Sequence, residues 1–284
     1  MEMRKVAAIH DLSCFGRCSL AVILPVLSVM GVQACPLPGT VLSTHTGGFG
    51  PVARTDLTGQ VEGTLEHWQR LGLSFDGIYT GYMASVEQIQ QAIQAVECLA
   101  APQAQVVVDP VLGDHGKLYS SMTQEMAQAM AQLCTHAHVI TPNLTEAAIL
   151  LGLAPDALLG AKGADVALEL SQQGERSVVV TGVTPEEGYT GAAWFDRTTG
   201  QAGTTVAVRA PGDYPGTGDL FSAVLTGGLV MGESLERAVG RAAHFISRCA
   251  SYTAAMGSDV REGVLFEPLL PLLLGDGLAM DDRI

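Results

Sequence analysis

The sequence has few charged residues, few aromatic residues and no long uninterrupted apolar segment. Of its 284 residues, 15% are charged and 5% are aromatic, whereas 48% are hydrophobic. Disordered chains have low hydrophobicity, so this composition excludes extensive disorder. The longest apolar stretch, residues 20–32, contains a proline and is shorter than the roughly 20 residues that a membrane-spanning helix needs. We therefore expect a soluble protein with no membrane partner.

Positive charge is scarce as well. The chain has 15 Lys and Arg residues against 29 Asp and Glu residues, which gives a net charge of −14. Such a field repels the phosphate backbone of nucleic acids, so we expect no nucleic-acid partner. A nucleotide can still bind an acidic protein where backbone N–H groups, helix N-termini and a divalent cation supply positive potential.

Several cysteine patterns and catalytic motifs are missing. The six cysteines form no CxxC pair and follow no regular spacing. Together with the lack of a signal-peptide pattern, this predicts reduced thiols and a cytoplasmic protein, with a zinc site or a redox dithiol as the alternative. The motifs GxxxxGKS/T, HExxH and GxSxG are also absent, and no GxGxxG follows the first predicted strand. These absences exclude P-loop, zincin, α/β-hydrolase and Rossmann-type dinucleotide-binding proteins.

Short β-branched segments alternate with longer segments of helical period. They predict strands at residues 5–9, 77–80, 105–109, 138–141 and 177–181, and helices at 18–30, 56–71, 86–99, 123–134, from about 145, and at 164–173. An antiparallel hairpin follows at 192–196 and 204–208, then helices at 219–231, 235–255 and near 269–274. This order predicts one α/β domain over residues 1–284: a doubly wound, mainly parallel sheet with helices on both faces and a small antiparallel hairpin.

Polar or small residues follow five of the predicted strands. Ligands bind beyond the carboxyl ends of parallel strands, so these positions are candidates for a site, although turn chemistry alone explains many of them. The positions are residues 10–11, 80–82, 109–110, 141–143 and 181–182.

The segment PGTGDLF, residues 215–221, precedes an apolar helical stretch. Two glycines allow a tight turn that leaves backbone N–H groups free at a helix start, which suits a transferred phosphoryl group. This turn is therefore a candidate anion site. Asp219 can accept the proton of an attacking substrate hydroxyl. An N-capping Asp beside a glycine turn is the purely structural interpretation.

Two acidic motifs are candidates for metal and phosphate binding. Asp109 and Asp114 in DPVLGD provide the oxygen ligands that Mg²⁺ prefers, although an Asx turn stiffened by proline explains the same residues. Glu146 in TPNLTE can hold a metal-bound water beside phosphates. Alternatively, Glu146 closes a capping box with Asn143.

A glycine-rich loop, THTGGFG at residues 44–50, contains one aromatic residue. Phe49 can form a wall over an aromatic substrate, or the loop can be an ordinary surface loop. His45 is either a structural hydrogen-bonding residue or a base.

Together these motifs resemble those of the pyridoxal (pyridoxine, pyridoxamine) kinases in the ribokinase-like superfamily. The resemblance extends from the first predicted strand to the helix after Asp219, and GTGD before a helix is shared by many members of the superfamily. DPVLGD with TPN and Glu146 is typical of vitamin kinases, and HTGGFG with TGY favours the pyridoxal kinases. The densest matches are LSTHTGGFG (42–50), YTGYM (79–83), DPVLGD (109–114), ITPNLTEA (140–147), VVVTG (178–182) and GTGDLFSAVL (216–225).

The resemblance implies transfer of a phosphoryl group from ATP to the 5′-hydroxymethyl group of a vitamin B6 vitamer, giving its 5′-phosphate. It implies that Asp219 is the catalytic base and that the amides of Gly216, Thr217 and Gly218 form the anion hole. It further implies Mg²⁺ bound with ATP, a monovalent cation such as K⁺, and a homodimer.

The resemblance assigns the other candidate residues by ligand. Those for Mg²⁺ are Asp109, Asp114 and Glu146. Those for ATP are Asp109, Tyr119, Thr141, Asn143, Glu146, Thr181, Gly182, Gly216 and Gly218. Those for the vitamer are Asp11, Thr46, Gly47, Tyr82 and Asp219.

The sequence departs from the pyridoxal kinase pattern at two positions. Asp11 stands where many of these kinases have a serine that contacts the ring, and Thr181 stands where many have a lysine. The alternative enzyme is a hydroxymethylpyrimidine kinase of thiamine synthesis, but GTGC is typical there and Asp219 argues against it. A sugar kinase is disfavoured by DPVLGD and TGY. A catalytically silent metabolite-binding sensor would be expected to lose the base or the glycines.

Overall fold

Runs of valine and isoleucine form the centre of the molecule, because such residues suit strands that are covered on both faces. The computed structural model describes residues 3–274. Five strands run parallel to one another at the centre of one sheet. They are β1 (Lys5–Ser13), β4 (Phe75–Thr80), β5 (Ala100–Val108), β8 (Val139–Ile140) and β9 (Ser177–Val183).

The full sheet has the order β11-β10-β9-β8-β5-β4-β1-β2-β3. At one edge, β2 (Gln33–Leu42) is parallel to β1, and the short β3 (Arg54–Asp56) is antiparallel to β2. At the other edge, β10 (Tyr189–Phe195) and β11 (Ala202–Val208) form the expected antiparallel hairpin, which continues the sheet beside β9. A separate two-stranded ribbon contains β6 (Gly113–Asp114) and β7 (Lys117–Leu118).

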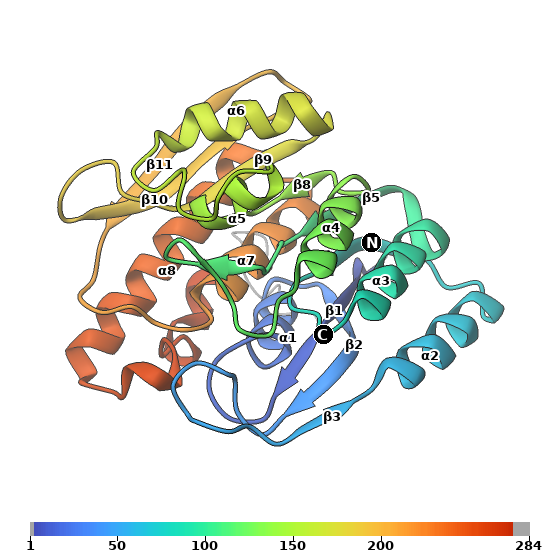
Figure 1. Ribbon diagram of the computed structural model, residues 1–284. Helices are drawn as coiled ribbons and strands as arrows, with labels where there is room; N and C mark the ends of the chain where they lie inside the picture. Colours follow the sequence, from blue (N-terminus) through green and yellow to red (C-terminus); the bar gives the residue numbers. More distant parts are fainter. Residues whose placement is uncertain (1–2, 275–284) are drawn as a thin grey trace, which may run out of the picture.

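Helices cover both faces of the sheet, as Figure 1 shows. One face packs against α2 (Thr58–Arg70), α3 (Val86–Leu99), α4 (Gln124–Cys134), α5 (Leu144–Leu150) and α6 (Gly163–Gly174). The other face packs against α1 (Leu20–Val29), α7 (Thr217–Val230) and α8 (Leu235–Met256), followed by 3₁₀ segments at Val260–Glu262 and Glu267–Leu273. The doubly wound, mainly parallel fold predicted from the sequence is confirmed. In the part of the chain described, no helix is both long and apolar enough to cross a membrane.

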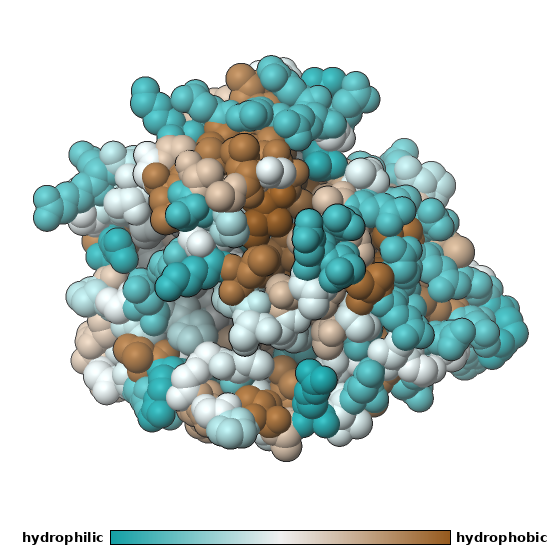
Figure 2. All heavy atoms as spheres, viewed as in Figure 1, coloured by the Kyte–Doolittle hydropathy of each residue, from teal (hydrophilic) through white to brown (hydrophobic). Residues whose placement is uncertain are grey.

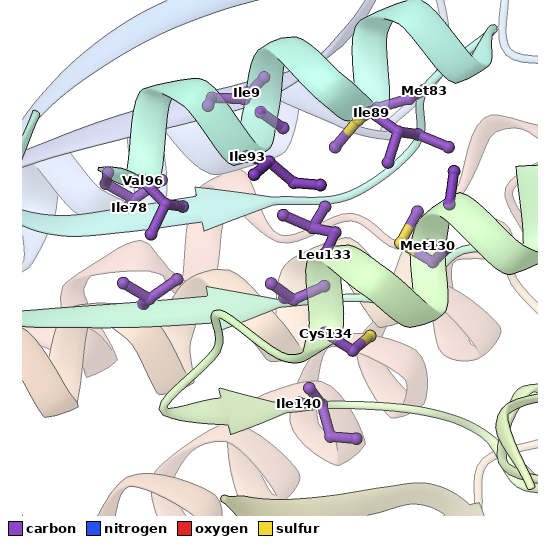
Figure 3. Packing of buried hydrophobic residues seen from close by; sticks show 14 of the residues in the cluster. Ile9, Ile78, Met83, Ile89, Ile93, Val96, Met130, Leu133, Cys134 and Ile140 are labelled. Carbon is purple, nitrogen blue, oxygen red and sulfur yellow. The ribbon is translucent and has the colours of Figure 1, made fainter. Parts of the chain in front are cut away.

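The core on the first face is built by the apolar stripes of α3 and α4. Figure 3 shows Ile89 and Ile93 of α3 close to Met130 and Leu133 of α4. The Leu133 side chain is fully buried. This packing fixes the helices beside β5 and β8, whose carboxyl ends carry candidate site residues.

The structure corrects several strand boundaries. β1 continues to Ser13, so His10 and Asp11 lie inside the strand and not after it, with a register shift between them. β9 likewise includes Thr181 and Gly182. Four short or irregular strands, β2, β3, β6 and β7, have no counterpart in the sequence prediction. β2 contains two prolines and a glycine, which are uncommon inside strands.

The order of the strands places a topological switch point beside β1. From β1 the chain moves to β2 on one side and then returns to β4 on the other side. In open α/β sheets, ligands bind outside the carboxyl ends of the strands at such a point. Any ligand site is therefore expected where β1 and β4 end.

Candidate active site

A cavity of about 680 Å³ opens beyond the carboxyl ends of the parallel strands. The structure brings all of the sequence-predicted site residues to its wall. They are Asp11, Thr46, Gly47, Tyr82, Asp109, Asp114, Tyr119, Thr141, Asn143, Glu146, Thr181, Gly182, Gly216, Thr217, Gly218 and Asp219. Figure 2 shows apolar side chains gathered in a band at the middle of the face drawn in Figure 1, with polar side chains on either side.

The start of α7 forms one wall of this cavity. Gly216 precedes the helix with φ 78°, and a Cβ atom there would lie 1.9 Å from the carbonyl oxygen of Arg17. Only glycine fits this position. The first N–H groups of an α-helix have no intrahelical acceptor, and the helix dipole is positive at this end. The turn therefore offers an anion-binding site.

Asp219 lies in the first turn of α7, partly exposed to the cavity. The Ser19 N–H group donates a hydrogen bond to Asp219 Oδ2 at 2.8 Å, and the Tyr79 hydroxyl donates to the Asp219 carbonyl at 3.3 Å. Burial raises the pKa of Asp219 to about 8, the charges of Asp109 and Asp11 raise it as well, and the Ser19 N–H group opposes them. Asp219 is therefore a carboxyl group with a high affinity for a proton near neutral pH.

Two buried carboxyl groups lie deeper in the cavity. Burial raises the pKa of Asp109 to about 7, while the hydroxyls of Thr141 and Ser222 favour its charged form. Burial and the charge of Asp109 together raise the pKa of Glu146. Neither carboxyl group forms an ion pair with a Lys, Arg or His residue among residues 3–274. The pair therefore favours a bound cation or a bound proton.

Glu146 also has the structural role that its spacing indicated. Its Oε2 atom accepts the Asn143 N–H at 2.9 Å, and Asn143 Oδ1 accepts the Glu146 N–H at 2.9 Å, which completes the predicted capping box of α5. Glu146 Oε1 accepts the N–H of Leu112 at 3.1 Å, and Asn143 Nδ2 donates to the carbonyl of Gly113 at 2.9 Å. These bonds hold the loop after β5 against the start of α5. The two acidic motifs thus form one unit.

The carboxylates suit magnesium better than a metal held by protein ligands alone. Within the described ranges, no three His, Cys, Asp or Glu side chains come close enough together to hold a metal ion. Mg²⁺, however, is usually bound by one or two carboxylates, by water and by substrate phosphates. Asp109 and Glu146 fit this arrangement. Asp114 is exposed on β6, and its Oδ1 atom accepts the N–H of His115 at 2.7 Å.

The other end of the cavity contains a third buried carboxylate, Asp11. Only 4% of Asp11 is exposed, and its two oxygens accept the hydroxyls of Ser19 at 2.5 Å and Ser13 at 3.0 Å. Burial raises the pKa of Asp11, and the two serine hydroxyls lower it. Thr46, Gly47 and Tyr82 line the cavity at the same end.

The loop of residues 44–50 is held in place by His45. The N–H of Gly47 donates to His45 Nδ1 at 3.1 Å, so the ring proton lies on Nε2, which donates to the Arg261 carbonyl at 2.6 Å. His45 is thus a structural hydrogen-bonding residue and not a base. Phe49 does not line the cavity, so it does not form the wall that was one of the two interpretations of this loop. It packs edge-on against Phe15 and His45 instead.

The cavity also has lining residues that the sequence did not indicate. Arg209 is the one Lys or Arg residue of this lining, and its Nη2 atom lies 3.3 Å from Asp213 Oδ1. Ser19 joins two of the carboxylates. An apolar part of the wall comes from β11 and α8, where Val208, Ile246 and Ala250 lie. The helical period of α8 is the signal that could have identified that apolar face.

Comparison with known proteins agrees with this geometry. Residues 44–263 match the family model described as phosphomethylpyrimidine kinase. The chain is 31% identical over 262 residues to a pyridoxine/pyridoxal/pyridoxamine kinase of Bordetella avium, covering 87% of this chain and 85% of that protein. The solved pyridoxal kinase of Lactobacillus plantarum is 36% identical with a TM-score of 0.88, covering 96% of this chain and 97% of that one.

A Bacteroides thetaiotaomicron protein is also similar, provisionally named a phosphomethylpyrimidine kinase and solved with pyridoxal. It is 39% identical with a TM-score of 0.88, and the match covers 96% of both chains. The family match and the relatives agree in fold and in reaction class. The chain therefore belongs to the phosphomethylpyrimidine kinase family and is a kinase with the ribokinase-like fold of the pyridoxal kinases.

Proposed function

We propose that this kinase transfers the γ-phosphoryl group of ATP to the 5′-hydroxymethyl group of a vitamin B6 vitamer: pyridoxal, pyridoxine or pyridoxamine. One observation carries the proposal. Asp219 lies beside the open N-terminus of α7, in the same cavity as the buried Asp109 and Glu146. The relatives named as pyridoxal kinases support a B6 vitamer as the acceptor.

The acceptor end of the reaction depends on Asp219. Asp11, Thr46, Gly47 and Tyr82 bind the vitamer ring and direct its hydroxymethyl group toward α7. The Ser19 N–H holds Asp219 Oδ2, so Oδ1 accepts the proton as the hydroxyl oxygen attacks the γ-phosphorus. The bond between this phosphorus and the ADP oxygen breaks, and ADP leaves. A base whose pKa lies near the working pH is well matched to this transfer.

The donor end depends on backbone dipoles and on carboxylates. The N–H groups of Gly216, Thr217 and Gly218 stabilise the charge of the transferred group, as preorganised donors do in phosphoryl transfer. Asp109, Asp114 and Glu146 are the residues that would hold Mg²⁺. When bound, the ion would supply neutralisation of the phosphate charge.

The remaining nucleotide contacts come from the loops after β7 and β8, from the end of β9 and from the apolar wall. The nucleotide is bound by Thr141, Asn143, Thr181 and Gly182, with Tyr119. Ile246 of α8 packs against its adenine ring. A K⁺ ion beside the phosphates, a homodimer and a cytoplasmic location complete the proposal.

The decisive experiment is a kinase panel with Mg-ATP against the three B6 vitamers and hydroxymethylpyrimidine, with the phosphorylated products identified by mass. We expect turnover of at least one vitamer. The Asp219→Asn variant should lose about 10²- to 10⁴-fold in kcat, the usual contribution of a general base, with small changes in KM. Near-normal turnover of this variant would disprove the role of Asp219.

The control is Asp165→Asn, which changes an exposed Asp in the first turn of another helix, α6, outside the cavity. It should keep the full kcat. Phosphorylation of the pyrimidine alone would assign the chain to thiamine synthesis. Absence of turnover with every acceptor would favour a sugar kinase or a silent metabolite-binding protein.

A further inference from the structure

Ser19 has a backbone conformation that non-glycine residues rarely adopt. Its φ is 52° and its ψ is −136°, and the other non-glycine residues with positive φ in the described chain are His115 and Glu175. Such conformations persist where the surrounding structure imposes them, and they cluster at functional sites. Ser19 lies in the wall of the active-site cavity and is buried.

Two hydrogen bonds join Ser19 to two different carboxylates. Its N–H donates to Asp219 Oδ2 at 2.8 Å, and its hydroxyl donates to Asp11 Oδ1 at 2.5 Å. Ser19 is also the N-cap residue of α1, where a serine oxygen usually accepts an N–H of its own helix. No such bond is present here. The side chain is therefore directed to Asp11 and not to capping.

The loop that leads to Ser19 is fixed from the opposite side. The carbonyl of Arg17 occupies the space that a Cβ atom on Gly216 would need. The Arg17 N–H donates to the carbonyl of Glu262 at 3.0 Å, and Arg17 Nε donates to Glu267 at 2.7 Å. The direction of the Ser19 N–H is thus set by Arg17 on one side and by the bond to Asp11 on the other.

We propose that Ser19 is a positioning residue for phosphoryl transfer. Its hydroxyl, anchored on Asp11, directs its N–H at one oxygen of Asp219 and leaves the other oxygen free for the acceptor hydroxyl. This inference rests on the proposed function, because it concerns the base of that reaction. The N–H bond also favours the charged carboxylate, against burial and the charge of Asp11. Loss of the bond should therefore raise the pH at which Asp219 ionises.

The test is the Ser19→Gly variant. Glycine adopts positive φ freely, so this variant removes the hydroxyl and releases the loop without adding strain. We expect kcat to fall about 10-fold or more, the effect of one hydrogen bond to a charged group. The acid limb of the kcat–pH profile should move to higher pH, while KM for ATP stays the same. Ser19→Asn, whose side-chain amide keeps a hydrogen-bond donor, should retain more of kcat than Ser19→Gly does.

Variants of two other serines distinguish a positioning role of Ser19 from a merely structural one. Ser13→Ala removes the other hydroxyl on Asp11, which has no bond to Asp219. We expect it to change KM for the vitamer without moving the acid limb. Ser234→Ala removes a serine that does cap its own helix, α8, through the Arg237 N–H at 3.3 Å. This variant should lower thermal stability only.

A second readout does not depend on turnover. In ¹⁵N-labelled protein, the amide proton of Ser19 should titrate together with Asp219, and this titration should vanish in Asp219→Asn. An amide that does not titrate overturns the inference, whether or not the chain phosphorylates a vitamer. A folded Ser19→Gly variant with wild-type kcat and an unmoved acid limb overturns it as well. Both of these results leave the proposed function intact, which fails only if the acceptor panel shows no vitamer turnover.

Discussion

At the residue scale, Gly216 places the turn before α7 directly against the loop after β1. Its positive φ favours glycine, and so does the carbonyl of Arg17 beside it. These are two separate constraints. The first is a property of the backbone conformation, and the second is a property of the neighbouring loop.

A pair of glycine variants separates the two constraints. Gly216→Ala should reduce kcat/KM by about 10²-fold, because a displacement of the turn by about 1 Å is enough for such a loss. Gly31→Ala is the matched control, since Gly31 has φ 80° and nothing within 4 Å of its would-be Cβ. Gly31→Ala should lose about 1–2 kcal/mol of unfolding free energy, measured with urea, because of its positive φ alone. Gly216→Ala should lose more than this, because its Cβ would also meet the Arg17 carbonyl oxygen. Equal catalytic efficiency in the two variants would refute the steric argument.

The residues of the site differ in how far their role can be predicted from the sequence. Asp109 and Asp219 are recognisable because each lies directly beside a local signal, a run of valines or a pair of glycines. Ser19 carries no such signal, since its partner Asp219 is 200 residues away and a serine before a helix is usually a cap. The place of Arg209 in the cavity could not be predicted either, because one arginine after a strand is common on any protein surface.

At the element scale, the packing of α3 against α4 holds the first face of the sheet. Leu133 is fully buried in this contact and does not line the cavity. Leu133→Ala should therefore cost about 2–5 kcal/mol of unfolding free energy, as large-to-small changes in a core do.

The control for this change is Leu168→Ala on α6, where the side chain is 39% exposed. It should change the free energy of unfolding by less than about 0.5 kcal/mol. KM for ATP should stay unchanged in both variants when measured well below the melting temperature. A loss at Leu133 no larger than that at Leu168 would contradict the packing described for α3 and α4.

Helices were easier to predict than strands in this chain. An apolar stripe of period 3.6 specifies α3 and α4 almost to the residue, because burial of one face decides the structure. The end of β1 was misjudged because His10 and Asp11 are polar, yet pairing with β2 extends the strand through them. β2 itself was missed because Pro36 and Pro38 interrupt its pattern. Its position beside β1 comes from tertiary pairing, which no local pattern encodes.

At the scale of the whole molecule, negative charge is concentrated in the cavity. Six carboxyl groups line it against the single guanidinium of Arg209. They are Asp11, Asp109, Asp114, Glu146, Asp213 and Asp219. Folding without a cation therefore places like charges together in a partly desolvated space.

This charge distribution predicts how stability depends on pH. The folded-state pKa values of Asp219, about 8, and Asp109, about 7, lie above the ordinary value near 4. Between these limits the folded chain binds more protons than the unfolded chain, so the free energy of unfolding falls as the pH rises from 5 to 8. Surface carboxyl groups such as Asp259, with a pKa of about 2, change the free energy of unfolding only at lower pH.

Urea titrations at several pH values, with and without Mg-ATP, measure this effect. Mg-ATP should stabilise the protein more at pH 8 than at pH 5, because metal binding requires deprotonated carboxylates. Stability that increases from pH 5 to pH 8 without ligand would contradict the prediction. The same curves test the expectation of one domain over residues 1–284, which requires a single cooperative transition.

The acidic lining of the cavity also influences how the phosphorylated product leaves. In the proposed reaction, phosphorylation adds about two negative charges to a vitamer beside Asp11 and Asp219, which both line the cavity. A cation bound at the carboxylates would offset this repulsion. Without the cation, the phosphate monoester would lie beside carboxylates of the same sign. We therefore expect the acidic walls to favour release of the product, so that the enzyme holds little of the vitamer phosphate that it makes.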